Sequence, residues 1–284
     1  MGIGQDLRMQ YQTGDLTTRL IFFNIGVFIL SIVFFYEFRF ATFDYPSWIA
    51  LSSNPVTVAT RPWTLLTYSF FHAGFFHLLF NLIILNFAGR LFLTFFNGRQ
   101  MLGLYVTSAI FAGACYLLGY YLLGRESLIV GASGAIMAVL MGATAYAPNM
   151  EIRLLLIGRI RLWHFSAGII LIDLLYILAE NTGGHIAHLA GAFFGYIYVH
   201  QIRRGRDLGS WMASAFGWAA GLQPKPKKSP FKKVHRSSKP AVAPQPGKNV
   251  QQRRVDEILD KIGKSGYDSL STEEKEYLFK AGKE

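Results

Sequence analysis

Hydrophobic residues gather in six runs separated by short polar stretches, and this pattern fills the first two thirds of the chain. A helix that crosses the hydrocarbon core of a membrane needs about 20 apolar residues, and all but the fourth run come close to that length. The pattern therefore predicts an all-α membrane protein with six transmembrane helices, of which the fourth is short. The predicted spans are residues 20–36, 77–96, 101–123, 133–147, 163–180 and 185–201.

The fourth run begins at Ser133 and is stopped by Pro148. A helix of this length rises about 22 Å, against a hydrocarbon core of about 30 Å. If its last turn lies at the cytosolic boundary, Ser133 lies on the order of 10 Å below the outer surface. Gly131 and Gly134 would let the backbone make a tight non-helical entry at that depth, which requires that protein or a water-filled cavity cover it.

Arginines are concentrated in the loops on one side of the predicted membrane. Because positive loops stay in the cytoplasm, this asymmetry predicts that both termini are cytoplasmic, as an even number of spans requires. The first span is interpreted as retained, since no small-residue cleavage pattern follows it. The cytoplasmic set is Arg8, Arg19, Arg90, Arg99, Arg153, Arg159, Arg161, Arg203, Arg204 and Arg206, against Arg39, Arg61 and Arg125 on the other side.

Most of the net charge belongs to the C-terminal part of the chain. From Gln201 onward there are eighteen basic and nine acidic residues, which accounts for +9 of the formal +11. The basic balance therefore describes a tail and not a nucleic-acid-binding surface; the tail is either a solvated linker or a contact for anionic lipid headgroups. Residues 223–250, rich in Pro, Lys and Ser, have the composition of a flexible linker.

Beyond this linker the sequence predicts a small cytosolic helical hairpin. Ile258 and Ile262 follow helical spacing, with Gly263 as the expected C-cap, and the run 271–274 (Ser-Thr-Glu-Glu) is a capping box that opens a second helix. The expected division is a cytosolic N-terminal segment 1–19, a membrane domain 20–201, a basic juxtamembrane segment and linker 202–250, and a hairpin 251–284.

Tryptophans mark two stretches outside the predicted spans. Residues 37–76 contain Trp48 and Trp63 among turn residues, which indicates either partial placement at the headgroup level or plain packing of a loop. Residues 208–222 contain Trp211 and Trp218 and are compatible with an interfacial helix.

Ser133 and His188 are the first candidates for chemistry, because each is a polar side chain inside a predicted span. Ser133 would lie at a helix N-terminus, where backbone N–H groups and the helix dipole favour a developing oxyanion. His188 precedes Gly191 and Gly195, a small-residue pattern that allows span six to pack closely on span four and brings an imidazole to the serine hydroxyl. The alternative is a small-residue packing patch with a histidine that bonds a backbone carbonyl.

Span two supplies a second group of polar residues. His77 and Asn81 are four residues apart and share a helix face, and both can donate a hydrogen bond to developing negative charge. His72 lies about a turn and a half earlier, where it would help to hold water or cap the helix.

Three motifs in this order strongly resemble the rhomboid family of intramembrane serine proteases, and the resemblance covers residues 20–200. The motifs are His77-x-x-x-Asn81 in span two, Gly131-x-Ser133-Gly134 at the start of span four, and Ala187-His188-x-x-Gly191-x-x-x-Gly195 in span six.

The resemblance implies a rhomboid-like bundle with a catalytic dyad of Ser133 and His188 and no acidic third member. It implies an oxyanion hole formed by the Ser133 N–H, the His77 ring and the Asn81 amide. It also implies that the substrates are transmembrane segments of other proteins, cut near their outer end. The tail resembles those of bacterial rhomboids, which implies a bacterial plasma membrane. Four further residues are expected to support the site: Gly131, Gly134, His72 and Gly191.

The chain departs from the family pattern at two positions near these motifs. Met137 stands where many members carry an aromatic residue against the catalytic imidazole, and Leu93 stands where an acidic residue is frequent. Asp173 in span five is interpreted as a structural carboxylate, either paired with a polar group on a neighbouring helix or protonated, and not as a third catalytic member. His185, three residues before His188, is interpreted as a polar group at the outer mouth.

Rival functions have less support in the sequence. A metal site built from the histidine pairs 72/77 and 185/188 would need ligands four apart on a helix, and these pairs are five and three apart. A transporter would show an inverted repeat, and none is visible. The sequence thus predicts a serine endopeptidase without metal or organic cofactor; the alternative is a non-catalytic rhomboid-like protein that binds transmembrane clients.

Overall fold

The computed structural model describes residues 2–154, 158–177, 179, 181–211 and 250–281. The chain divides into two compact units, Met1–Pro224 and Lys225–Glu284, and each is described by itself. Among the described residues, helices dominate both units, and the strands of the first unit form three two-stranded antiparallel sheets.

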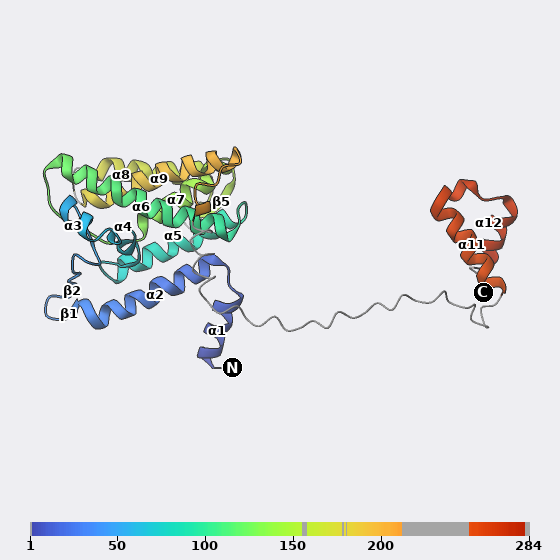
Figure 1. The fold of residues 1–284 in the computed structure, drawn as a ribbon, viewed down its shortest axis with the longest axis horizontal. Coiled ribbons are helices and arrows are strands. Elements are labelled where there is room, and N and C mark those ends of the chain that lie inside the picture. Colours follow the sequence, from blue (N-terminus) through green and yellow to red (C-terminus); the bar gives the residue numbers. More distant parts are fainter. Residues whose placement is uncertain (1, 155–157, 178, 180, 212–249, 282–284) are drawn as a thin grey trace. The chain divides into compact units, whose positions relative to one another are not determined.

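The first unit is a bundle in which each predicted span corresponds to one helix (Figure 1). After an amphipathic helix α1 (Ile3–Thr13), the six helices are α2 (Leu16–Phe35), α5 (Phe75–Leu93), α6 (Gly98–Leu123), α7 (Ser133–Tyr146), α8 (Leu162–Tyr176) and α9 (Thr182–Arg203). The predicted all-α membrane bundle with a short fourth helix is therefore confirmed.

The six helices differ in how well they could cross a bilayer unaided. Among the described residues, α2, α5 and α6 are long and apolar enough to span a membrane by length and composition, whereas α7 and α8 are shorter apolar helices. The fifth helix is shorter than predicted, since α8 ends at Tyr176. Large apolar side chains such as Val33, Phe34 and Leu175 are exposed on α2 and α8, which is the surface that lipid tails cover in a multi-pass membrane protein.

Helix α7 is the centre of the bundle. Figure 1 shows it between α5 on one side and α8 and α9 on the other, and ten of its fourteen residues are buried. A helix surrounded by protein does not have to match the thickness of the bilayer, because its neighbours shield its ends from lipid. This position explains why the fourth span can be short.

Close contact between the backbones of α7 and α9 fixes the two helices against each other. A β-carbon added at Gly191 would overlap the carbonyl oxygen of Gly134, and one at Gly195 would overlap the carbonyl oxygen of Ala138. Only glycine permits this approach, which is the behaviour of small-xxx-small patterns in membrane helices. The predicted close packing of span six on span four is confirmed.

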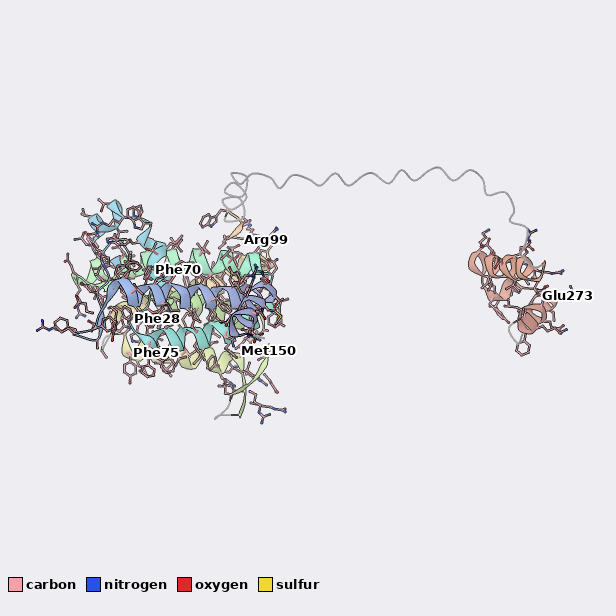
Figure 2. The ribbon with its side chains drawn as sticks, turned by 90° about the horizontal axis from the view of Figure 1, so that it is seen from below. Phe28, Phe70, Phe75, Arg99, Met150 and Glu273 are labelled. Atoms are coloured by element: carbon pink, nitrogen blue, oxygen red, sulfur yellow. The ribbon has the colours of Figure 1, made fainter. Side chains whose placement is uncertain are left out.

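The two ends of the bundle are distinct. Figure 2 shows Arg99, at the start of α6, and Met150, just after α7, toward one end, and Phe75, at the start of α5, toward the other. Helix α6 begins with a capping box between Asn97 and Gln100. Ser133, as the first residue of α7, belongs to the end of the bundle where α5 begins.

The segment between α2 and α5 packs on the bundle. It contains β1 (Tyr36–Glu37) paired with β2 (Thr42–Phe43), and β3 (Leu51–Ser52) paired with β4 (Leu128–Ile129), the strand just before α7. It also contains the short helices α3 (Pro55–Thr60), α4 (Thr64–Thr67) and η1 (Tyr68–Phe70). The indole of Trp63 donates to the carbonyl of Trp48 (2.9 Å), so loop packing, one of the two predicted roles, is present. A hairpin of β5 (Glu151–Leu154) and β6 (Gly158–Arg161) joins α7 to α8.

The second unit is the predicted helical hairpin, made of α11 (Val250–Ser265), η2 (Tyr267–Ser269) and α12 (Thr272–Ala281). The capping box is confirmed: the N–H of Ser271 donates to the Glu274 carboxylate (2.8 Å), and the N–H of Glu274 donates to Ser271 Oγ (3.3 Å). The predicted C-cap at Gly263 is wrong, because α11 continues to Ser265 and the left-handed residue is Gly266 (φ +77°). The proposed interfacial helix 208–222 lies mostly outside the described residues.

Candidate active site

The residues predicted to carry the chemistry line one cavity of about 540 Å³ in the first unit. Ser133 contributes from the start of α7, His188 from α9, and His77 and Asn81 from the first turns of α5. Four side chains from three helices thus face one space, whose remaining walls are largely apolar. Apolar walls of this kind lower the local dielectric constant and so strengthen the electrostatic interactions made beside them.

Gly131 sets the approach of the chain to Ser133. Its φ of +145° is a conformation that residues with a side chain rarely adopt. A β-carbon there would also lie 3.0 Å from His77 Nε2 and 3.6 Å from Ser133 Oγ. The Gly131 N–H donates to the carbonyl of Tyr68 (3.0 Å), which ties this turn to the loop before α5. The expected role of Gly131 as the residue that permits the turn fits this geometry.

Ser133 is the first residue of α7 and is partly exposed to the cavity. The N–H groups of a first helical turn have no partner within the helix, and they carry the positive end of the helix dipole. Gly134, the next residue, is buried against the backbone of Ala187 on α9, where a β-carbon would lie 3.1 Å from its carbonyl oxygen. The serine hydroxyl therefore lies beside a set of backbone N–H donors at the start of α7.

Hydrogen bonds within α5 and the turn before it define which atoms of His77 and Asn81 can donate. The Ala73 N–H donates to His77 Nδ1 (3.3 Å), so the ring carries its proton on Nε2, the nitrogen beside Gly131 and Ser133. Asn81 donates one amide N–H to the carbonyl of His77 (2.7 Å), and its second amide N–H has no such bond among the described residues. Each side chain thus has a free donor for an anion near Ser133.

The hydrogen-bond partner of His188 assigns it the opposite tautomer to that of His77. Its Nδ1 lies 2.9 Å from Oδ1 of Asp173 on α8, and an ionised carboxylate can only accept, so Nδ1 carries the proton and Nε2 keeps a lone pair. Within the described residues no hydrogen bond joins His188 to Ser133 Oγ, although both residues line the same cavity. Such bonds are often long in an enzyme without substrate.

Of the two expectations for Asp173, pairing and protonation, the structure shows pairing with polar groups on a neighbouring helix, and it shows two such contacts. Oδ1 lies 2.7 Å from His185 Nδ1 and 2.9 Å from His188 Nδ1, and the residue is only 3% exposed. Sequence reasoning placed His185 at the outer mouth and missed this shared carboxylate. The signal that could have found it is the acidic residue in the middle of span five together with two histidines one helical turn apart in span six.

Three groups in this cluster also have the chemistry of metal ligands. Among the described residues, Asp173, His185 and His188 place ligand atoms within 4.8 Å of one another. Both nitrogen–oxygen separations are hydrogen-bond lengths, so hydrogen bonding accounts for both contacts. We therefore treat it as a hydrogen-bonded cluster.

His72 lies beside the site and outside the cavity lining. Its ring contacts that of His77 edge to face, with centroids 5.3 Å apart, and its carbonyl accepts from the Tyr45 hydroxyl (2.8 Å). Burial, reinforced by the neighbouring His77, lowers the pKa of His72 to about 3, so the ring is neutral near pH 7. The alternative role as a helix cap is wrong, because α5 begins after Gly74 without a side-chain cap.

The two positions that depart from the family pattern have different surroundings. Met137 is buried and lines the cavity one turn after Ser133. Leu93 is the last residue of α5 and packs against the core at the other end of that helix. Of the two, only Met137 is placed to affect the site.

Comparison with known proteins gives matches for both units. The family described as "Rhomboid domain" matches residues 59–205, and a family of unknown function, DUF6576, matches residues 246–282. Similar curated proteins are the mitochondrial presenilin-associated rhomboid-like proteins of Homo sapiens (29% identical over 158 residues) and Mus musculus (28% over 158). The mitochondrial presenilin-associated rhomboid-like protein A of Danio rerio is 28% identical over 154 residues. Each match covers 52% of this chain and 39–40% of the relative, well under two thirds of those proteins.

Proposed function

The chain belongs to the rhomboid family, and from this premise we propose that it is an intramembrane serine endopeptidase that cleaves transmembrane segments of other proteins. The observation that carries the proposal is the hydrogen-bond partner that each of two histidines has beside one cavity, because these partners assign the two rings opposite tautomers. His77 presents an N–H at Nε2, as an oxyanion donor must, and His188 presents a lone pair at Nε2, as a general base must.

The proposed reaction follows from these assignments. Ser133 Oγ attacks the carbonyl carbon of the scissile peptide while His188 Nε2 takes the hydroxyl proton. The oxyanion that forms accepts hydrogen bonds from the Ser133 N–H, His77 Nε2–H and the free N–H of Asn81. The C–N bond then breaks as His188 gives its proton to the leaving amine.

Hydrolysis of the acyl-enzyme completes the cycle. Water attacks the ester carbonyl, His188 takes a proton from that water, and the same proton returns to Ser133 Oγ as the ester bond breaks. The reaction as written uses only groups of this chain and needs no metal or organic cofactor. Gly131, Gly134 and Gly191 serve by permitting the turn and the close helix contact that hold Ser133 and His188 together.

The setting proposed for this reaction is a bacterial plasma membrane. The protein is an integral multi-pass membrane protein, and the arginine asymmetry of its loops supports cytoplasmic termini. Ser133 would then lie toward the outer side, so a client helix would enter from the bilayer and be cut near its outer end. Transmembrane proteins are the proposed partners, together with the bilayer itself; nucleic acid is not.

Cleavage of a transmembrane substrate by purified protein in proteoliposomes tests the proposal. The native chain should cut, and Ser133→Ala and His188→Ala should each lose activity by about 10³-fold or more. Ser166→Ala is the matched control, because Ser166 is a buried serine on α8 whose hydroxyl bonds Thr144 (2.7 Å), and it should cut like the native chain. A folded native chain that retains the substrate uncut would favour the client-binding alternative.

A further inference from the structure

Two histidines of α9 contact the same carboxylate oxygen of α8, and one of these histidines, His188, is the proposed base. Asp173 Oδ1 is 2.7 Å from His185 Nδ1 and 2.9 Å from His188 Nδ1. The residue Asp173 is 3% exposed, and its second carboxylate oxygen, Oδ2, is buried without a partner among the described residues. A buried charge is costly unless it is paired, so its position against two imidazoles calls for a physical reason.

The positions of the protons follow from these contacts. An ionised carboxylate oxygen accepts from both Nδ1–H groups at once, and a proton on Oδ2 would have no acceptor among the described residues. If His188 carried its proton on Nε2, the lone pair of Nδ1 would face the carboxylate oxygen at 2.9 Å, which is repulsive. Both contacts are satisfied with Asp173 ionised and both histidines protonated on Nδ1.

No other group among the described residues holds the His188 ring by a hydrogen bond. Gly191 fixes the backbone of α9 against α7 but leaves the side chain free to rotate. Met137 lines the same cavity with a flexible thioether that can donate nothing, and the His185 ring lies edge-on with its centroid 6.0 Å away. The orientation and tautomer of the proposed base therefore depend on Asp173.

We propose that Asp173 is a positioning residue for the reaction: it holds His188 with Nδ1 protonated and Nε2 turned to Ser133, while His185 fixes the carboxylate. The inference rests on the proposed function of Ser133 and His188. During attack the Ser133 proton moves to His188 Nε2, and the resulting imidazolium keeps its Nδ1–H bonded to Asp173, which stabilises the cation. The proton then leaves from Nε2 to the amine, so Asp173 itself is never protonated.

Kinetics of carboxylate variants on a transmembrane substrate in proteoliposomes give the first test. Asp173→Asn keeps the shape but presents an amide that can donate to Nδ1 and so favours the wrong tautomer; kcat should fall on the order of 10²-fold with KM changed less than about threefold. Asp173→Glu should recover part of kcat. His185→Asn should lose less than about tenfold, and Ser166→Ala nothing. The inference is overturned if Asp173→Asn has the kcat of the native chain, or if its loss of kcat/KM comes from a raised KM.

A spectrum of the native protein gives a test that does not depend on activity. In detergent, ¹⁵N-labelled histidine side chains report which ring nitrogen holds the proton, and His188→Gln identifies the signal of His188. The inference predicts a protonated Nδ1 with a bare Nε2 for that residue; a proton on Nε2 contradicts it even if Asp173→Asn fails to fold. A native chain that neither cleaves the substrate nor reacts with a serine-directed covalent probe defeats the proposed function instead. The spectrum still decides the tautomer of His188 in that case.

Discussion

The helix contact between α7 and α9 and the helix contact between α11 and α12 are built on opposite principles. In the first, Gly191 and Gly195 bring one backbone against the carbonyl oxygens of the other. In the second, Lys261 Nζ reaches both oxygens of the Glu274 carboxylate (2.9 and 2.8 Å), and Ile258 and Leu270 are the buried apolar residues nearby. Apolar helices gain no hydrophobic stabilisation by associating in lipid, so close packing of complementary surfaces holds α7 and α9 together. In water, the hydrophobic effect contributes to the association of α11 and α12.

This difference indicates at which contact the addition of a single carbon atom should disturb the structure. At the contact between α7 and α9, one added methyl group meets a backbone carbonyl that cannot move aside without shifting Ser133. At the hairpin contact, charged side chains end in solvent and can rearrange, so their individual contributions are small and depend on salt. Both the chemistry and the sensitivity to mutation should therefore be concentrated in the membrane unit.

The largest effect is expected from Gly191→Ala. The new β-carbon would overlap the Gly134 carbonyl oxygen, and forcing extra volume into a packed contact costs about 1–3 kcal/mol or more while displacing the helix that carries His188. Cleavage should be lost and the thermal unfolding temperature in detergent should drop. Gly168→Ala on α8 is the matched control, because nothing lies within 4 Å of its added carbon; equal behaviour of the two variants would disprove the account of this contact.

Removal of single oxyanion donors should come next. His77→Ala deletes the Nε2–H beside Ser133, and Asn81→Ala deletes the remaining amide donor; each should lower kcat by about 10²–10³-fold with little change in KM. Steady-state kinetics on the same transmembrane substrate measure both parameters. A variant that loses affinity for substrate while keeping kcat would show that these residues bind the ground state and do not stabilise the transition state.

Removal of residues 223–284 should have a smaller effect on chemistry. Every group assigned to the reaction lies in the first unit, so the truncated protein should cleave a substrate in detergent within tenfold of the full chain. Rates normalised to folded protein, as judged by circular dichroism, make the comparison. A greater loss in a folded core would mean that the tail contributes to the site.

The smallest effect concerns the pH response of the hairpin. Hydrogen bonds from Lys261 and from the Ser271 N–H lower the pKa of Glu274 below its usual value of 4.5. Because the folded state holds this carboxylate ionised, its stabilising effect is present above that usual value and is lost as the pH falls through the lowered pKa. Hydrogen exchange of the α12 amides, corrected for intrinsic rates, should rise modestly in acid; Glu274→Gln should show the raised exchange already at pH 7. Identical exchange in both proteins at pH 7 would remove Glu274 from this role.

Sequence patterns predicted the bundle well because helix-forming runs and small-residue repeats act locally. The six helices, the close contact at Gly191 and the shared face of His77 and Asn81 follow from spacing along single helices, whereas the gathering of these two residues with Ser133 is implied by the resemblance to the rhomboid family. The shared carboxylate did not follow, because Asp173 and His185 belong to different helices whose relative rotation is decided by packing. The C-cap at Gly263 was wrong for a related reason: a glycine inside a helix is tolerated, and the turn needed the positive φ found at Gly266.

The central claim is that His188 activates Ser133, and covalent labelling of the detergent-solubilised protein tests it most directly. A fluorophosphonate probe followed by peptide mass spectrometry should place a single adduct on Ser133. The adduct should disappear in Ser133→Ala and His188→Ala and persist in Ser166→Ala. A folded native chain that takes up no probe, or one whose Ser133 is labelled equally well without His188, would contradict the account.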